Sequence, residues 1–189
     1  MKVKIHCFEG EWDRKHPELS IKPLIKLLEQ LYVSCGNTLV SSHKLCQSIN
    51  RLSENLKLDG RNFSNKSVQH CLYFAFHGDG NGLWGSAGDG SVSFDEIASS
   101  LGQKAAGSII FFGSCGTRAS SVSLATLKAR TNARLVVGYA ASVDWLKSSM
   151  FEMLFFNELC NYQKFGAFVN KMNDTASQPL FSKLKVRMI

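Results

Sequence analysis

The chain has 189 residues, of which 44% are hydrophobic and 20% charged, and its formal net charge is +7. This length supports one sizeable core and falls short of two ordinary domains, so residues 1–189 are expected to form a single domain. The composition is that of a globular protein, and no apolar run is long enough for a membrane span, which argues against a membrane partner.

The positive charge is spread along the chain. The 22 Lys and Arg residues form no dense basic run and no aromatic-interleaved segment of the kind that binds RNA, so a solvated basic surface is favoured over a nucleic-acid partner. The first residues lack the apolar region and the cleavage site of a signal peptide, and the chain has no C-x-x-C pair. We therefore expect a cytoplasmic protein with reduced thiols.

The first part of the chain is expected to alternate strands and helices. Residues 2–8 alternate polar and apolar side chains, which predicts a strand, and apolar positions at helical spacing over 21–31 predict a crossover helix. A short strand is expected over 38–41, followed by a helix that Ser42 caps. The polar residues 59–67 are expected to form a surface loop.

Two apolar strands in the middle of the chain each end in a reactive side chain. One strand ends at His77 and the other, over residues 108–114, is followed by Cys115. The separation of 115 − 77 = 38 residues leaves room for a loop and one crossover helix, whose capping box begins at Ser93. Parallel neighbours in an open α/β sheet would place both side chains at the carboxyl edge, where ligands bind.

The remaining segments continue the alternation. The pattern predicts a helix over 119–129, a strand over 133–139, helices over 146–162 and 165–175, and a last strand. The central strands are apolar throughout, which is typical of a parallel sheet covered on both faces. The sequence therefore predicts an α/β fold, a three-layer sandwich with a mainly parallel six-stranded sheet and helices on both faces.

A glycine-rich segment follows His77. Residues 78–90 are expected to form a mobile loop that orders on substrate, and Trp84 could either close over the substrate or anchor the loop to the core. G-x-G-x-x-G at 80–85 is a weak dinucleotide fingerprint because no helix follows it directly. Residues 89–95 carry oxygen ligands at alternate positions but lack the central glycine and closing Glu of a calcium loop. We therefore expect no cofactor and no metal.

His77 and Cys115 together supply what thiol acyl transfer needs. The thiol must lose its proton to become a nucleophile, and a nearby imidazole can take that proton and pass it to the leaving amine. The backbone N–H groups of Gly78 and Cys115 could stabilise a developing oxyanion. Either residue alone would more often be structural, but their shared sheet edge favours a catalytic pair. No third, acidic member of the site is obvious.

The chain contains an apolar block that ends in His-Gly, then a spacer, and then an apolar block that ends in a small residue and Cys. This order resembles the signature of the caspase-like (clan CD) cysteine peptidases. That group includes caspases, metacaspases, gingipains, legumain, separase and the CHAT peptidases. Residues 136–145 are similar to the segment that follows the Cys strand in the bacterial CHAT-like branch. The resemblance covers about the whole chain. It implies a caspase-like sandwich, a Cys115 nucleophile, a His77 general base or acid, and an oxyanion hole formed by Gly78 and Cys115.

The resemblance also has implications for partners. It implies a protein or peptide substrate, and, because the chain has no acidic processing linker after Cys115 and no partner domain, an activating protein or small ligand. By analogy with bacterial effectors it suggests regulated proteolysis in defence against phage. The alternative is a catalytically silent caspase-like module that binds a partner or senses a ligand at the same edge.

In the caspase-like group the primary pocket is lined by the loops after the first strand, just before the Cys, and after the next strand. Here the first loop offers the acidic residues Glu9, Glu11 and Asp13. The other two offer the neutral Gly113 and then Asp144 beside Trp145. No Arg or Lys is placed to receive a substrate carboxylate, so cleavage after Arg or Lys is expected, with Asp144 as the first candidate and Asp13 the second. Asp144 could instead only cap the following helix.

Overall fold

The computed structural model describes residues 2–10, 20–34, 39–46, 52, 56, 68–78, 80, 82–85, 90–114, 121–142 and 144–189. A six-stranded sheet with strand order β2-β1-β3-β7-β8-β9 forms the centre of this structure. Its strands are β1 (Lys2–Gly10), β2 (Leu39–Cys46), β3 (Val68–Ala75), β7 (Ile109–Phe112), β8 (Leu135–Tyr139) and β9 (Val186–Met188). All neighbours are parallel except β8 and β9. The predicted mainly parallel, six-stranded α/β sheet is therefore confirmed.

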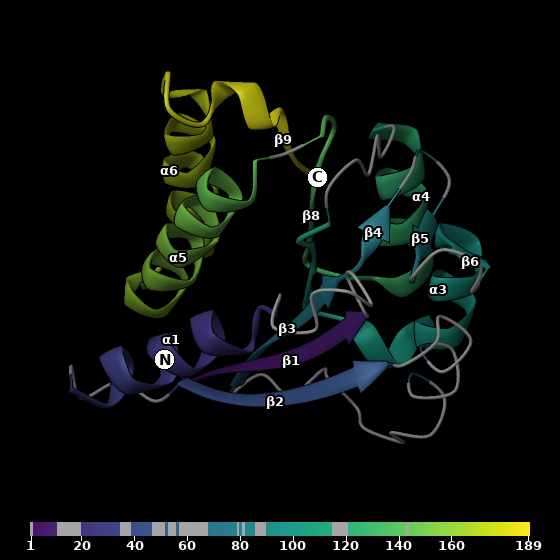
Figure 1. Cartoon of the computed structure of the whole chain (residues 1–189), viewed down its shortest axis with the longest axis horizontal. Helices are drawn as coiled ribbons and strands as arrows, with labels where there is room; N and C mark the ends of the chain where they lie inside the picture. Colours follow the sequence, from purple (N-terminus) through teal and green to yellow (C-terminus); the bar gives the residue numbers. More distant parts are fainter. Residues whose placement is uncertain are drawn as a thin grey trace.

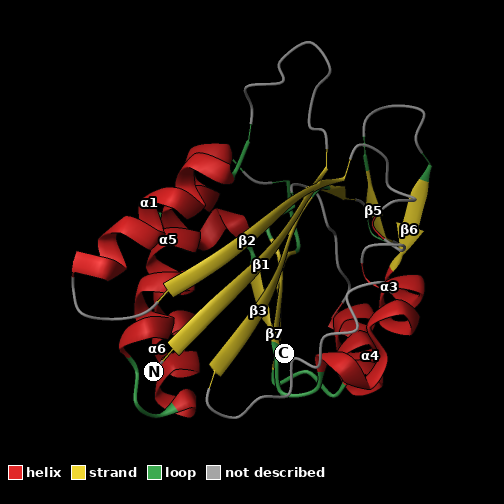
Figure 2. Ribbon diagram, turned by 90° about the horizontal axis from the view of Figure 1, so that it is seen from below, coloured by secondary structure: helices red, strands yellow, loops and turns green. Residues whose placement is uncertain are grey.

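Helices cover both faces of this sheet (Figure 1). Helices α1 (Lys22–Ser34), α5 (Trp145–Asn161) and α6 (Phe165–Ser177) lie on one face, and α3 (Phe94–Leu101) and α4 (Ser121–Thr131) lie on the other (Figure 2). The described residues also include two short 3-10 helices, Gly102–Ala105 and Ser182–Leu184. None of the described helices is long and apolar enough to cross a membrane.

The core lies in two apolar clusters, one on each side of the sheet. On β3, Cys71 and Tyr73 face α1 and α5, while Leu72 and Phe74 face the side of α3 and α4. Successive side chains of a strand point to opposite faces, so a strand buried on both faces must be apolar throughout. Each of these large side chains contributes on the order of 1.5–3 kcal/mol when it is buried.

A second, antiparallel sheet follows β3 directly. It consists of β4 (His77–Gly78), β5 (Gly82–Trp84) and β6 (Ser91–Ser93). The expectation of one continuous glycine-rich loop over 78–90 is therefore wrong for these strands. A side chain at Gly82 would collide with the carbonyl oxygen of Val92, so glycine here permits the close approach of β5 and β6.

The structure also corrects the expected end of the second strand. Strand β2 continues to Cys46, and Ser42 pairs with His6 of β1 instead of capping a helix. Pairing with β1 over eight residues outweighs the local capping preference of a serine. Leu52 and Leu56, which lie in the expected helix, are helical and buried.

Candidate active site

The ends of β3 and β7 lie side by side. The two parallel strands pair from Cys71 with Ile109 to Phe74 with Phe112, a constant offset of 38 residues. Beyond the last pair, the N–H of Gly113 donates to the carbonyl of Phe74 at 3.0 Å, so the pairing continues past the end of β7. The offset equals the 38 residues between His77 and Cys115, which is the spacing that neighbouring strand ends require.

A buried serine ties these two strand ends together. Ser114 is fully buried, and its Oγ accepts a hydrogen bond from the N–H of Phe76 at 3.1 Å and donates to the carbonyl of Phe74 at 3.3 Å. Phe76 directly precedes His77, and Ser114 directly precedes Cys115. Cys115 itself lies outside the described residues. Sequence reasoning missed Ser114, although a lone hydroxyl in a run of large apolar residues was the available signal.

His77 lies at the start of the small sheet and is half-buried. Its imidazole stacks on the indole of Trp84, with ring centroids 4.4 Å apart and ring planes 17° apart. The two residues are also paired across β4 and β5, and Gly78 pairs with Leu83. Trp84 therefore fixes one face of the imidazole. Whether it also closes over a substrate stays a prediction.

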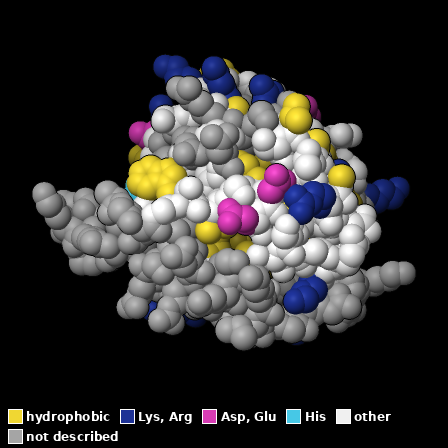
Figure 3. Space-filling model, turned by 90° about the vertical axis from the view of Figure 1, so that its right-hand side faces the viewer, with side chains coloured by type: hydrophobic (Ala, Val, Ile, Leu, Met, Phe, Trp, Pro, Cys, Tyr) yellow, Lys and Arg dark blue, Asp and Glu magenta, His cyan; other side chains and the backbone are white. Residues whose placement is uncertain are grey.

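The side of the molecule that carries the small sheet, α3 and α4 has a mixed surface. Figure 3 shows acidic and basic side chains lying next to each other on this face, between hydrophobic and polar groups. One such pair is exposed, with Arg130 Nη1 2.8 Å from Asp95 Oδ1. Ion pairs of this kind contribute little to stability, on the order of 0–1 kcal/mol.

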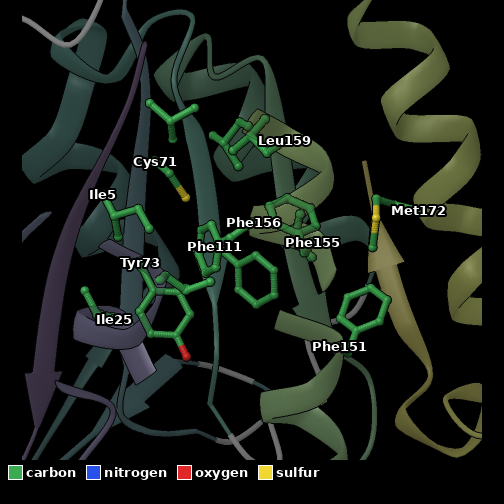
Figure 4. Close-up of a cluster of buried hydrophobic side chains, with 14 of the residues drawn as sticks. Ile5, Ile25, Cys71, Tyr73, Phe111, Phe151, Phe155, Phe156, Leu159 and Met172 are labelled. Carbon is green, nitrogen blue, oxygen red and sulfur yellow. The ribbon is translucent and has the colours of Figure 1, made fainter. Parts of the chain in front are cut away.

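Gly113 occupies a position with no room for a side chain. A Cβ built there would overlap the hydroxyl and ring of Tyr73, which is itself buried on β3. The predicted pocket residue Gly113 therefore offers backbone only, and the space behind it belongs to Tyr73. Figure 4 shows the Tyr73 hydroxyl pointing along the strand, away from Cys71 and toward the carboxyl edge.

The Tyr73 hydroxyl belongs to a buried polar bridge. It donates to Glu152 Oε2 at 2.7 Å, and the hydroxyl of Tyr139 donates to Glu152 Oε1 at 2.9 Å. Glu152 is 1% exposed, and burial raises its pKa to about 8 against the two hydrogen bonds that lower it. The sequence interpretation missed this carboxyl. Its signal was an acidic residue on the apolar face of α5, between Phe151 and Phe155.

The residues predicted to set specificity have distinct places. Asp144 is the N-cap of α5, because its Oδ1 accepts a hydrogen bond from the N–H of Lys147 at 2.9 Å. Asp144 therefore caps the helix, and its role in a substrate pocket stays a prediction. Asp144 is exposed, and Trp145 beside it is 40% exposed. Asp13 lies outside the described residues.

Glu9 has a structural role. It ends β1 next to Gly10, is fully buried, and accepts hydrogen bonds from the hydroxyl of Ser20 at 2.8 Å and from the N–H of Ile21 at 2.7 Å. These contacts stabilise the start of α1, where a carboxylate also interacts favourably with the helix dipole. This correction removes Glu9 from the candidate pocket acids.

The described thiols are unsuited to nucleophilic chemistry. Cys7, Cys46, Cys71 and Cys160 form no disulfide and are buried. Burial raises the pKa of Cys71, and burial with the nearby Glu9 carboxylate raises the pKa of Cys7, so both remain protonated at neutral pH. The described part of the chain holds no group of three or more His, Cys, Asp or Glu that could bind a metal ion.

Comparison with known proteins places the chain in a family. The profile of a family of unknown function (DUF6642) matches residues 2–188, so the chain belongs to this family. No curated protein matches it.

The structure is similar to that of a secreted C11 cysteine protease from Bacteroides thetaiotaomicron, solved in complex with an irreversible peptide inhibitor. The TM-score is 0.58 at 12% sequence identity, over 98% of this chain and 58% of the protease, so this chain spans little more than half of that protein. The similarity shows that the fold is caspase-like.

Proposed function

We propose that this member of the DUF6642 family is a cysteine endopeptidase with a catalytic dyad of Cys115 and His77. One observation carries the proposal. The Ser114 hydroxyl bonds the N–H of Phe76, so the residues that directly precede the two candidates are held together by a buried hydrogen bond. The caspase-like fold, shared with a cysteine protease, supports the same reaction class.

In the proposed reaction, the Cys115 sulfur attacks the carbonyl carbon of the scissile peptide bond. His77 takes the thiol proton and delivers it to the leaving amine, which departs as the carbon–nitrogen bond breaks. Water then attacks the thioester and releases the second product and the free thiol. The N–H groups of Gly78 and Cys115 are proposed to stabilise the oxyanion in both steps.

Trp84 is proposed to orient the base and to contact the substrate. Its indole stacks on one face of the His77 ring and not on the ring edge that carries the two nitrogens, through which protons are transferred. Holding a general base in one orientation removes a large entropic cost from the reaction. The sequence left open whether Trp84 closes over the substrate or anchors the loop. The contact with His77 adds the orientation of the base to these roles.

We further propose that the enzyme cleaves after Arg or Lys. Asp144 is exposed, and within the described part of the chain no Lys or Arg forms an ion pair with it. Its capping bond uses one carboxylate oxygen, which leaves the other for a substrate cation. Trp145 could hold the aliphatic part of that side chain, Asp13 is the second candidate acid, and Gly113 would contribute backbone groups.

The cellular setting is part of the same proposal. Four buried cysteines that form no disulfide support a reducing compartment such as the cytoplasm. The resemblance to the CHAT-like bacterial branch supports activation by another protein or a small ligand and a role in defence against phage. These parts of the proposal rest on analogy, and the chemistry of the dyad does not depend on them.

A peptide-library assay with the purified protein tests the proposal. We expect cleavage after Arg and Lys by the wild type and none by Cys115→Ala. Iodoacetamide should label Cys115 before Cys7 or Cys71, because a partly exposed thiolate reacts fastest. Full cleavage by Cys115→Ala would refute the dyad. Rapid Cys115 labelling without any cleavage would favour the silent binding module.

A further inference from the structure

The Glu152 bridge connects three elements immediately below the candidate active site. Glu152 is on α5, Tyr73 is on β3 four residues before His77, and Tyr139 is the last residue of β8. All three side chains are at most 1% exposed. Burying a carboxyl group in an aromatic core is unfavourable, and apolar side chains of similar volume would fill the same space at no such cost.

The bridge reaches the strand end that leads to Cys115. The Tyr73 hydroxyl fills the space where Gly113 would carry a side chain, so these two residues are in direct contact. Gly113 is in turn bonded to Phe74, and the next residue is Ser114 with its bonds to both Phe74 and Phe76. A displacement of Tyr73 would therefore be transmitted to the segment directly before Cys115.

The carboxyl group can hold Tyr73 in either protonation state. An ionised carboxylate accepts from both hydroxyls, and a protonated one donates to one hydroxyl and accepts from the other. Among the described residues, the thiol of Cys7 on β1 also interacts with Glu152 electrostatically, and it is buried as well. Among the described residues, no Lys, Arg or His pairs with Glu152.

We propose that Glu152 is a positioning residue of the endopeptidase: through Tyr73 it fixes Gly113 and Ser114, and thereby the place of Cys115. This inference rests on the proposed function. It assigns Tyr73 to the same task and gives Tyr139, which bonds the other carboxylate oxygen, no part in it. The effect is on the alignment of the nucleophile, so turnover should change more than substrate binding.

Tyr73→Phe and Tyr139→Phe form a matched pair of variants. Each removes one buried hydroxyl from the same carboxyl group and keeps the ring, but only Tyr73 touches Gly113. We expect Tyr73→Phe to lower kcat about tenfold with KM nearly unchanged. Tyr139→Phe should keep kcat within about twofold, while both variants lose a similar amount of stability, about 1 kcal/mol in chemical unfolding. Equal kcat values for the two variants would overturn the proposal.

Glu152→Gln keeps the size of the side chain and tests the carboxyl group itself. It should lower kcat in the same direction as Tyr73→Phe, and adding it to Tyr73→Phe should lower kcat no further, because both act through one contact. Additive losses would show that Glu152 acts independently of Tyr73 and would refute the inference.

The rate of Cys115 alkylation separates this inference from the proposed function. We expect Tyr73→Phe to change the rate at which iodoacetamide modifies Cys115, and Tyr139→Phe to leave it unchanged. Absence of thiol-dependent cleavage in the wild type would refute the endopeptidase. Identical alkylation rates in all variants would refute the positioning role of Glu152, whatever the outcome of the cleavage assay.

Discussion

The carboxyl edge of the sheet contains two regions that are built differently. The ends of β3 and β7 are held by buried hydrogen bonds from Gly113 and Ser114. The segment after β8 leads to Asp144 and Trp145, which are exposed and held by a helix cap. Buried hydrogen bonds are costly to break, whereas an exposed cap contributes on the order of 1 kcal/mol. A rigid region suits the chemical step, and an exposed region suits substrate selection.

The largest expected effect would break the first region. His77→Ala should lower kcat/KM by roughly 10²–10⁴, because the general base is lost. His70→Ala is the matched control, since His70 lies on β3, the strand that precedes His77, and its Nδ1 is 3.0 Å from His6 Nε2, far from the carboxyl edge. Peptide cleavage by both variants gives the comparison. Similar losses in the two variants would mean that His77 has no catalytic role.

A smaller effect should follow from loosening the same region. Ser114→Ala removes the hydroxyl that joins the two strand ends, and we expect about a tenfold fall in kcat with about 1–3 kcal/mol of lost stability. Ser108→Ala is the control at the other end of β7, where a buried hydroxyl donates to the carbonyl of Ala105 at 2.7 Å. The control should lose stability and keep kcat. An unchanged kcat in Ser114→Ala would contradict the role of this hydrogen bond in alignment.

The second region is tested by Asp144→Asn. Asparagine keeps a capping oxygen and removes the charge, so thermal stability should stay nearly unchanged while kcat/KM for an Arg peptide falls about tenfold. Asp144→Ala should also lose the cap, at a cost of about 1 kcal/mol. Steady-state kinetics on Arg and neutral peptides, together with thermal unfolding, separate the two contributions. Unchanged kinetics on Arg and Lys peptides would rule out the basic pocket.

A last effect, on stability, concerns Glu152, which bonds Tyr73 of β3 and Tyr139 of β8 and so joins the two regions. Burial raises its pKa from 4.5 to about 8, so the folded state keeps a proton that the unfolded state releases. The contribution of Glu152 to the free energy of unfolding should therefore be largest below pH 4.5 and decrease as the pH rises to about 8. Urea unfolding should show this decrease in the wild type and less of it in Glu152→Gln. If the free energy of unfolding changed with pH in the same way in both proteins, the raised pKa of Glu152 would be contradicted.

The sequence predicted the sheet because its signal is periodic and local. The apolar strands and the helical spacing reflect which faces are buried. The separation of His77 and Cys115 equals the 38-residue offset between the paired strands β3 and β7. The small sheet was missed because glycines indicate flexibility and close strand contact equally well, and only Gly82 against Val92 decides between them. Ser42 was misassigned because pairing with β1 overrode its capping preference.

The candidate site was less predictable from the sequence for a physical reason. Hydrogen bonds such as Ser114 to Phe76 and Tyr73 to Glu152 join residues 38 and 79 positions apart, so they leave no periodic pattern. The stacking of Trp84 on His77 depends on a hairpin that was interpreted as a loop. The cap that Asp144 forms at the start of α5 was one of two alternatives that the sequence offered, because a helix cap is a local signal.

The position of β1 inside the sheet has a consequence for synthesis on the ribosome. Strand β1 pairs on one side with β2 and on the other with β3, beginning at Lys2 with Val68. At about 5–20 residues per second, the 68 − 2 = 66 residues between these partners take roughly 3–13 seconds to be made. During that interval an apolar strand has one unpaired edge. The nascent chain is therefore most exposed to aggregation before β3 emerges, and slower translation would prolong that interval.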